Sequence, residues 1–121
     1  MDSTEIDEVA AIIAAFDAQV GDRHRSLALI GRFRVRAGAG PRIEKEFAKA
    51  SAQTANEAGV LAYQLHREPN DPDVFVVYER WRSLDDLDAH LRMPYIAALR
   101  AEIAAVMEGQ PEFQVILPTA T

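Results

Sequence analysis

The stretch VFVVYERWRSLDDLDAH, residues 74–90, contains the features that decide the fold. Its first five residues are apolar without interruption, which is typical of a strand covered on both faces. Side chains alternate along a strand, so Phe75, Val77, Glu79 and Trp81 point to one face. The sequence therefore predicts a carboxylate and the chain's single tryptophan side by side on a buried surface.

A short helix follows this strand and carries a histidine. Ser83 and Asp86 have the spacing of a capping box, which predicts a helix that opens there and ends near Leu91. His90 stands three residues after Leu87, on the side of that apolar residue. We therefore expect the imidazole to lean toward the core, either as a satisfied structural residue or as a group that transfers protons.

The rest of the chain is predicted to alternate between strands and helices in the order β-α-β-β-α-β. Apolar runs bounded by turn-forming residues predict the strands, and apolar residues at helical spacing predict the helices. This order is that of the ferredoxin-like fold, an α+β fold with an antiparallel sheet. One extra amphipathic helix precedes it, at residues 4–20. The predicted strands are residues 27–36, 60–67, 73–81 and 112–117, and the later helices are residues 41–57, 83–91 and a segment from Pro94 that ends before Gly109.

The apolar third strand also predicts a partner for the sheet. The chain has helices enough to cover one face of a four-stranded sheet, yet residues 74–78 call for cover on both faces. A second copy of the chain, joined sheet to sheet, would supply the missing cover. We therefore expect a homodimer.

The charge balance excludes several kinds of partner. The chain has 121 residues, which is enough for one domain, and a formal net charge of -6. The excess lies in the first 22 residues, which hold six acidic and no basic side chains, so the remainder is neutral. Nucleic acid needs a concentrated basic surface and is not expected as a partner. The longest apolar runs are too short to span a membrane, so we expect no membrane partner and a cytoplasmic location.

The sequence carries no motif for a common cofactor or metal. Gly38-Ala39-Gly40 lacks the third glycine of a dinucleotide-binding loop and the lysine of a phosphate-binding loop. There is no cysteine, and the three histidines have no recognisable metal-ligand spacing. We therefore predict no cofactor and no metal site.

Polar and aromatic side chains on the predicted buried surfaces remain as candidates for chemistry. Glu79 must either be paired, with Arg67 or Arg32, or have a raised pKa that suits general acid or base catalysis. Trp81 either packs in the core or stacks on a substrate. His66 ends a strand, where exposure to solvent is usual.

Two tyrosines and a row of arginines complete the candidates. Tyr63 and Tyr95 either line a cavity or fill it. Arg32, Arg34 and Arg36 alternate along a predicted strand and so point to one side. They either form a solvated or salt-bridged edge or attract an anionic substrate.

Taken together, these elements resemble the antibiotic biosynthesis monooxygenase (ABM) family. The segment AGVLAYQLHREPNDPDVFVVYERWRSLDDLDAHLRMPYIAAL, residues 58–99, contains in order a glycine, a tyrosine-containing strand that ends in a histidine, a Pro/Asp turn, an apolar strand that ends in Glu-x-Trp, and a helix with His-Leu. The preceding LALIGRFRVRAGAGPRIEKEF, residues 27–47, fits the family's first strand and helix. The resemblance covers about residues 27–118. It implies an ABM-type domain at 25–121 after an acidic helical extension at 1–24.

The resemblance implies a dimeric α+β barrel that oxidises a small aromatic substrate, such as a quinol, phenol or anthrone, with molecular oxygen and without a cofactor. An electron-rich substrate, once deprotonated, can itself pass an electron to oxygen, so the protein need only bind, desolvate and deprotonate it. By motif position, the implied catalytic groups are His90, His66 and Glu79. The candidate substrate-binding residues are Trp81, which would stack on the substrate, and Tyr63, Tyr95 and Arg32.

The sequence leaves three other functions open. Haem-degrading members usually carry an asparagine on the first strand, where this chain has Ile30-Gly31-Arg32-Phe33, so haem degradation is disfavoured. An isomerase acting on a phosphorylated metabolite would gain from Arg32, Arg34 and Arg36, which could meet a phosphate. A non-catalytic module that binds a small molecule would use the same barrel.

Overall fold

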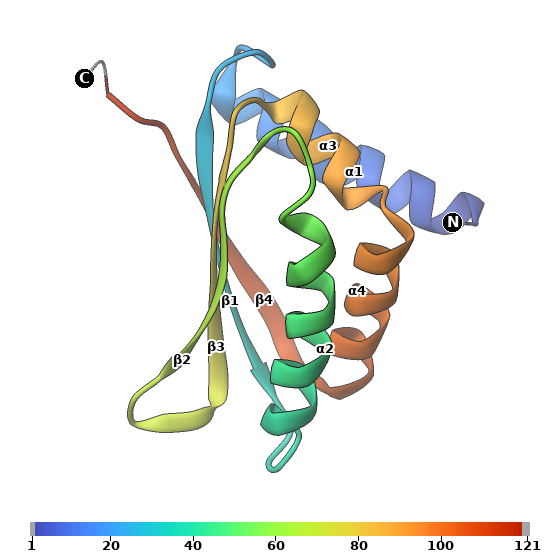
Figure 1. Ribbon diagram of the computed structural model, residues 1–121, viewed down its shortest axis with the longest axis vertical. Coiled ribbons are helices and arrows are strands. Elements are labelled where there is room, and N and C mark those ends of the chain that lie inside the picture. Colours follow the sequence, from blue (N-terminus) through green and yellow to red (C-terminus); the bar gives the residue numbers. More distant parts are fainter. Residues whose placement is uncertain (1, 120–121) are drawn as a thin grey trace.

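The computed structural model describes residues 2–119 and has the predicted α+β fold. A four-stranded sheet has the strand order β2-β3-β1-β4, and each neighbouring pair is antiparallel. The helices lie on one side of the sheet, with α2 and α4 side by side and α1 across one end (Figure 1). The elements are α1 (Ser3–Val20), β1 (Leu27–Val35), α2 (Gly40–Thr54), β2 (Val60–Glu68), β3 (Asp71–Trp81), α3 (Leu84–Leu91), α4 (Pro94–Val106) and β4 (Met107–Ile116).

Without α1, the order of elements is the predicted ferredoxin-like one, and the extra N-terminal helix is present. Two boundaries differ from prediction by three residues or more. Strand β4 begins at Met107 because Gly109 adopts a left-handed φ of 72° and the β1–β4 register shifts between Arg32 and Arg34, so pairing continues past the irregularity. Helix α2 ends at Thr54, and the next residues form a turn that leads into β2.

The two faces of the sheet differ in their cover. Register and core packing place Phe75, Val77, Glu79 and Trp81 of β3 on the helix side, which confirms the predicted alternation. The other side, here called the open face, has no helix over it in the single chain (Figure 1). The open face carries Ala28, Ile30, Arg32 and Arg34 from β1 and Val74, Val76, Tyr78 and Arg80 from β3.

Helix α1 completes the core beside Trp81. Asp2 caps the helix by accepting a hydrogen bond from the Glu5 backbone N–H at 2.9 Å. The apolar stripe of α1 then packs against β1, β3 and α3, as an added element against the body of the protein. The buried residues in this cluster are Val9, Ile13, Phe16, Val20, Leu27, Leu29, Trp81, Leu84 and Leu87.

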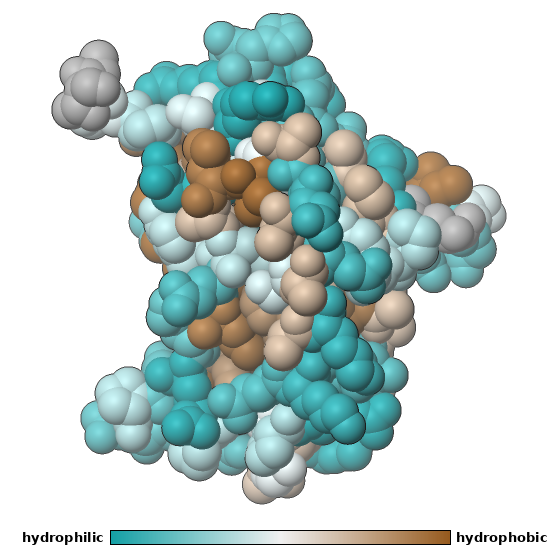
Figure 2. Space-filling view, in the orientation of Figure 1, coloured by the Kyte–Doolittle hydropathy of each residue, from teal (hydrophilic) through white to brown (hydrophobic). Residues whose placement is uncertain are grey.

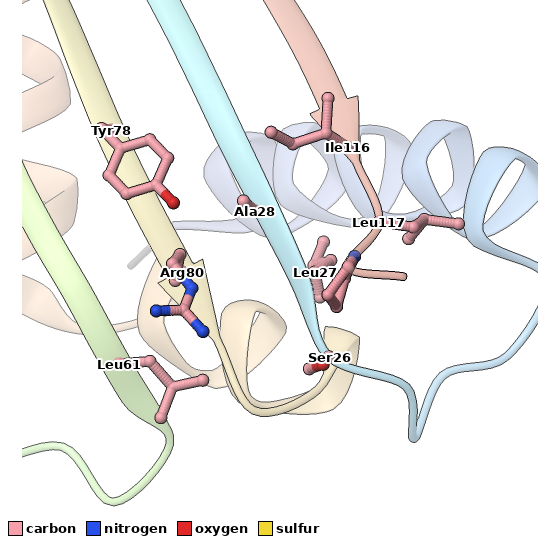
Figure 3. Close-up of a pocket in the computed structure, with 9 residues that line it drawn as sticks. Ser26, Leu27, Ala28, Leu61, Tyr78, Arg80, Ile116 and Leu117 are labelled. Carbon is pink, nitrogen blue, oxygen red and sulfur yellow. The ribbon is translucent and has the colours of Figure 1, made fainter. Parts of the chain in front are cut away.

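The open face combines a small apolar hollow with a row of ion pairs. Leu61, Ala28, Tyr78 and Ile116 line a hollow of about 130 Å³, and the Arg80 side chain lies beside it (Figure 3). Further along the sheet, each of two strand arginines pairs with an acidic residue. Arg32 Nε lies 2.9 Å from Glu68 Oε1, and Arg34 Nη2 lies 2.7 Å from Asp71 Oδ2.

The outer surface in the view of Figure 2 is mostly hydrophilic, and its apolar side chains lie in small separate areas. Between Asp2 and Thr119, no helix is both long and apolar enough to cross a membrane.

Candidate active site

Glu79 and Trp81 lie two residues apart at the end of β3 and bind each other. The Trp81 indole Nε1–H donates to Glu79 Oε1 at 3.0 Å, and the exposed fractions of the two residues are 0% and 8%. Neither predicted ion-pair partner reaches this carboxylate, because Arg32 binds Glu68 and Arg67 lies 3.9 Å from Glu44. Glu79 is therefore a buried acid, and its hydrogen-bond donor within β3, the Trp81 indole, carries no charge.

Burial raises the pKa of Glu79 from 4.5 to about 7. Desolvation of the carboxylate is the largest cause, the Trp81 hydrogen bond opposes it, and the negative charge of Glu57 raises the pKa further. A carboxyl group with this pKa can give or take a proton near neutral pH, as general acid–base catalysis requires.

The raised pKa predicts how replacing Glu79 with glutamine changes stability. Between pH 4.5 and about 7 the folded state keeps a proton that the unfolded state releases, so the free energy of unfolding falls as pH rises through this window. Glutamine has no carboxyl group to ionise, so Glu79→Gln does not lose this part of the free energy of unfolding as pH rises. We expect the variant to match the wild type near pH 4.5 and to be more stable by about 3 kcal/mol at pH 8.5, in urea unfolding at both pH values.

Urea unfolding of Glu46→Gln is the control for removal of a carboxylate. Glu46 lies on the surface of α2 and pairs with Lys49. An equal gain for Glu79→Gln at both pH values would contradict the assignment of a raised pKa.

His90 reaches the same buried space from α3. The Ser83 hydroxyl caps this helix by accepting from the Asp86 N–H at 3.1 Å, which confirms the predicted capping box. His90 is 1% exposed, and its ring centroid is 4.4 Å from that of Trp81. Its Nε2 lies 4.0 Å from Glu79 Oε1. The structure thus brings Glu79, Trp81 and His90 together.

The other side of the imidazole meets a residue that the sequence did not single out. Glu57 Oε2 lies 3.0 Å from His90 Nδ1, and the Tyr95 hydroxyl donates to the same oxygen at 2.5 Å. Desolvation lowers the pKa of His90, while the hydrogen bond and charge of Glu57 act to raise it. The imidazole is consequently neutral at pH 7 and has a lone pair that can accept a proton.

Aromatic rings close the space around His90. Tyr63 stacks on Phe47 with centroids 4.8 Å apart and meets the His90 ring edge-on at 5.0 Å. Desolvation raises the pKa of Tyr63 far above its ordinary value, and burial together with Glu57 raises that of Tyr95 to about 12. Both tyrosines are therefore neutral at physiological pH and act through shape and hydrogen bonding.

Two predicted site residues lie away from this cluster. His66 is exposed on the open face, with Nδ1 3.3 Å from the Val76 carbonyl oxygen. Arg32 is on the same face and is held by Glu68. The sheet separates both from Glu79 and His90. Of the two sequence alternatives for the arginine row, the salt-bridged surface describes Arg32 and Arg34.

A cleft of about 540 Å³ opens on the solvent side of Glu57, where the turn after α2 meets α3 and the start of α4. This volume lies within the range of small-molecule sites. Trp81 and His90 do not line it, whereas Glu57 belongs both to the cleft and to the buried cluster. The lining residues are Gln53, Asn56, Glu57, Ala58, Gly59, Asp86, Ala89, Met93 and Tyr95.

Comparison with known proteins assigns this arrangement to a family. Residues 26–102 match the family model for antibiotic biosynthesis monooxygenase, ABM. The chain belongs to the ABM family. The matched segment contains the whole Glu79–His90–Glu57 cluster and excludes α1, the end of α4 and all of β4.

Individual proteins are similar to this ABM protein over most of its length. A heme oxygenase (mycobilin-producing) from Mycobacterium tuberculosis strain H37Rv is 35% identical over 91 residues, which are 73% of this chain and 87% of the relative. A Caulobacter crescentus CB15 structure assigned to the same monooxygenase group has a TM-score of 0.76 at 25% identity, covering 88% of this chain and 99% of its own. The Rv0793 structure from M. tuberculosis has a TM-score of 0.72 at 25% identity, covering 79% and 97%.

The heme oxygenase relative differs from what the first strand of this chain leads one to expect. Haem degradation was disfavoured on the residues of the first strand, yet a relative with that activity in its name is 35% identical. At this strand Gly31 faces the helices, and a Cβ added there would lie 3.0 Å from the Phe113 ring and 3.1 Å from Val77. The position therefore has little room for a larger side chain.

Proposed function

We propose that this ABM protein is a monooxygenase that oxidises a small electron-rich aromatic, such as a quinol, phenol or anthrone, with molecular oxygen and without a bound cofactor. For a phenol, one oxygen atom enters the ring to give the quinone and the other leaves as water. The four electrons that reduce oxygen come from the substrate. The protein's part is to bind the substrate, exclude water and accept the hydroxyl proton, which makes the ring a stronger electron donor.

The observation that carries this proposal is the buried group of Glu79, His90 and Trp81. His90 is a neutral base in a space closed to solvent, and Glu79 beside it changes protonation near pH 7. Two neighbouring groups with pKa values moved in opposite directions are characteristic of sites that transfer protons.

Of the predicted substrate-binding residues, Tyr95 is the one on the cleft. Trp81 and Tyr63 pack in the core beneath it, where α1 covers Trp81. Substrate must therefore displace part of this packing to bring its hydroxyl to His90 Nε2. Arg32 is left out of the proposed site because it lies on the open face.

Oxygen uptake by the purified protein tests this function. We expect consumption of oxygen with at least one member of a quinol, phenol and anthrone panel, without added flavin, haem or metal, and formation of the quinone by absorbance. Heat-denatured protein is the control for autoxidation. A full panel that leaves uptake at the autoxidation rate would exclude the proposal, and turnover that persists without oxygen would indicate the isomerase alternative instead.

Haem is the second candidate substrate, and the 35% identical heme oxygenase is the observation that favours it. His90 is the only histidine of the cluster, and its Nδ1 is already bound by Glu57. Titration of haem followed by its Soret absorbance, with a reductant and oxygen added afterwards, measures this activity separately. Haem breakdown without quinol oxidation would replace the first candidate by the second.

We also propose that the protein is a homodimer in which the open faces of two copies meet. The apolar side chains around the hollow, Leu61, Ala28, Tyr78 and Ile116, are the surface that a second copy would cover (Figure 3). We expect sedimentation to give twice the chain mass of 13.4 kDa. Tyr78→Glu, which places a charge at the centre of the face, is expected to give monomers. A wild type that sediments as a monomer at all concentrations would contradict the dimer.

A further inference from the structure

Glu57 is a partly buried acid in a turn rather than in a regular element. The turn begins where α2 ends at Thr54, and the Glu57 N–H donates to the Thr54 carbonyl oxygen at 2.9 Å. This turn aims the side chain inward, where it is 9% exposed. The carboxylate then receives the Tyr95 hydroxyl at 2.5 Å and lies 3.0 Å from His90 Nδ1. Its inward position is thus fixed by two donors from two helices, α3 and α4.

The Glu57–His90 contact determines which imidazole nitrogen carries hydrogen. A carboxylate can only accept, so the hydrogen bond requires an N–H at Nδ1. In the neutral ring, Nε2 then has the lone pair, and it points toward Glu79 and Trp81. An acid that orients a histidine in this way is the general arrangement of base and orienting group in proton-transfer sites.

The cleft gives this pair a connection to solvent. Glu57 lines the cleft on one side and contacts His90 on the other, so it lies between bulk water and the buried imidazole. The second acid of the cleft, Asp86, is neutralised by Arg82 at 2.9 and 3.0 Å. Tyr95 completes the cleft side of Glu57 as a hydrogen-bond donor.

We propose that Glu57 is a positioning residue that holds His90 with its Nε2 free as the base, and that it carries the proton from His90 out to the cleft. This rests on the proposed function for the identity of the proton donor, a substrate hydroxyl. The substrate O–H bond breaks as the proton moves to Nε2, and the Nδ1 proton of the resulting imidazolium passes to Glu57. Glu57 then releases it to water in the cleft, and the electron pair stays on the substrate oxygen. When the second oxygen atom leaves as water, it takes the proton from Nε2, and a proton that returns from the cleft through Glu57 restores the hydrogen on Nδ1.

Several charged or titratable groups face His90 and shape its response to pH. Glu57 lies at Nδ1 and raises the pKa of the imidazole, whereas desolvation and Arg100 of α4 lower it. Glu79 of β3 lies at Nε2, and Tyr63 of β2 lies against the ring. Without the Glu57 charge, desolvation and Arg100 lower the pKa of His90 and nothing opposes them.

Glu57→Gln tests the inference, with Glu46→Gln on α2 as the matched control. We expect the pKa of His90, measured by NMR titration of its ring protons, to fall in Glu57→Gln and to stay at the wild-type value in Glu46→Gln. We expect kcat for quinol oxidation to fall about 100-fold in Glu57→Gln, with an altered pH profile, and to be unchanged in the control. Glu57→Asp keeps the charge and is expected to restore part of both properties.

The outcomes separate this inference from the proposed function. Turnover by the wild type, with kcat and the His90 titration both unchanged in Glu57→Gln, would overturn the role of Glu57 and leave the function standing. If the wild type oxidises nothing, the function fails, and the His90 titration alone decides whether Glu57 holds the imidazole. If Glu57→Gln does not fold, Glu57→Asp and Tyr95→Phe are titrated instead, and a His90 pKa equal to wild type in both would overturn the inference.

Discussion

His90→Gln is expected to lower kcat for quinol oxidation by about 100- to 10,000-fold while the protein stays folded. Glutamine keeps much of the side-chain volume and can still donate to Glu57, so the helix and the buried carboxylate keep a partner. It cannot accept a proton near pH 7, so the step that activates the substrate is lost. Oxygen uptake under saturating substrate measures the loss, and far-UV circular dichroism with thermal unfolding measures the fold.

His24→Gln is the matched control, because His24 lies in the loop before β1 with a side chain that is 85% exposed. We expect its kcat to equal that of the wild type. A His90→Gln protein that keeps more than a tenth of the wild-type kcat would show that the proton goes to another group.

Trp81→Ala is expected to lower the free energy of unfolding by about 3 to 5 kcal/mol, the cost of a large cavity in a packed core. Trp81 has no exposed surface and contacts His90, Tyr63 and the residues of α1. The change also removes the indole N–H from Glu79, which leaves a buried carboxyl without that donor. Urea unfolding followed by far-UV circular dichroism is the measurement, since the variant has no tryptophan to report by fluorescence.

Two further variants divide this loss into its parts. Trp81→Phe keeps an aromatic ring but removes the N–H, so we expect a smaller loss of about 1 to 3 kcal/mol and a higher pKa for Glu79. Ile6→Ala on α1, where the side chain is 43% exposed, is expected to cost less than about 1 kcal/mol. A Trp81→Ala protein as stable as Ile6→Ala would mean that α1 closes over the gap.

The fold was predictable because its signals are local and periodic. The alternation in residues 74–81 placed Glu79 and Trp81 on one face, and the Ser83–Asp86 spacing placed the start of α3, both as the structure has them. The start of β4 was missed because Gly109 ordinarily ends a helix, whereas here it lies within a strand at a register shift. Such an irregularity depends on pairing with β1, which is distant in the sequence.

The site was predictable only in part, for the same reason. Glu79 and His90 stand in regular elements, so their direction follows from strand and helix geometry. Glu57 stands in a turn after α2, and 33 residues separate it from His90, so no spacing rule connects the two. One local signal was present, since Gly59 has no room for a Cβ against Asp86, which shows that this turn packs tightly on α3.

The packing of α1 over Trp81 has a consequence for the order in which the protein can be made. Synthesis proceeds from the N-terminus, so α1 is complete long before the strand and helix residues that it covers, such as Trp81, Leu84 and Leu87. Contacts between such distant segments form late because the intervening chain must first close into a loop. During translation the apolar stripe of α1 is therefore without its partner surface until β3 and α3 have been made.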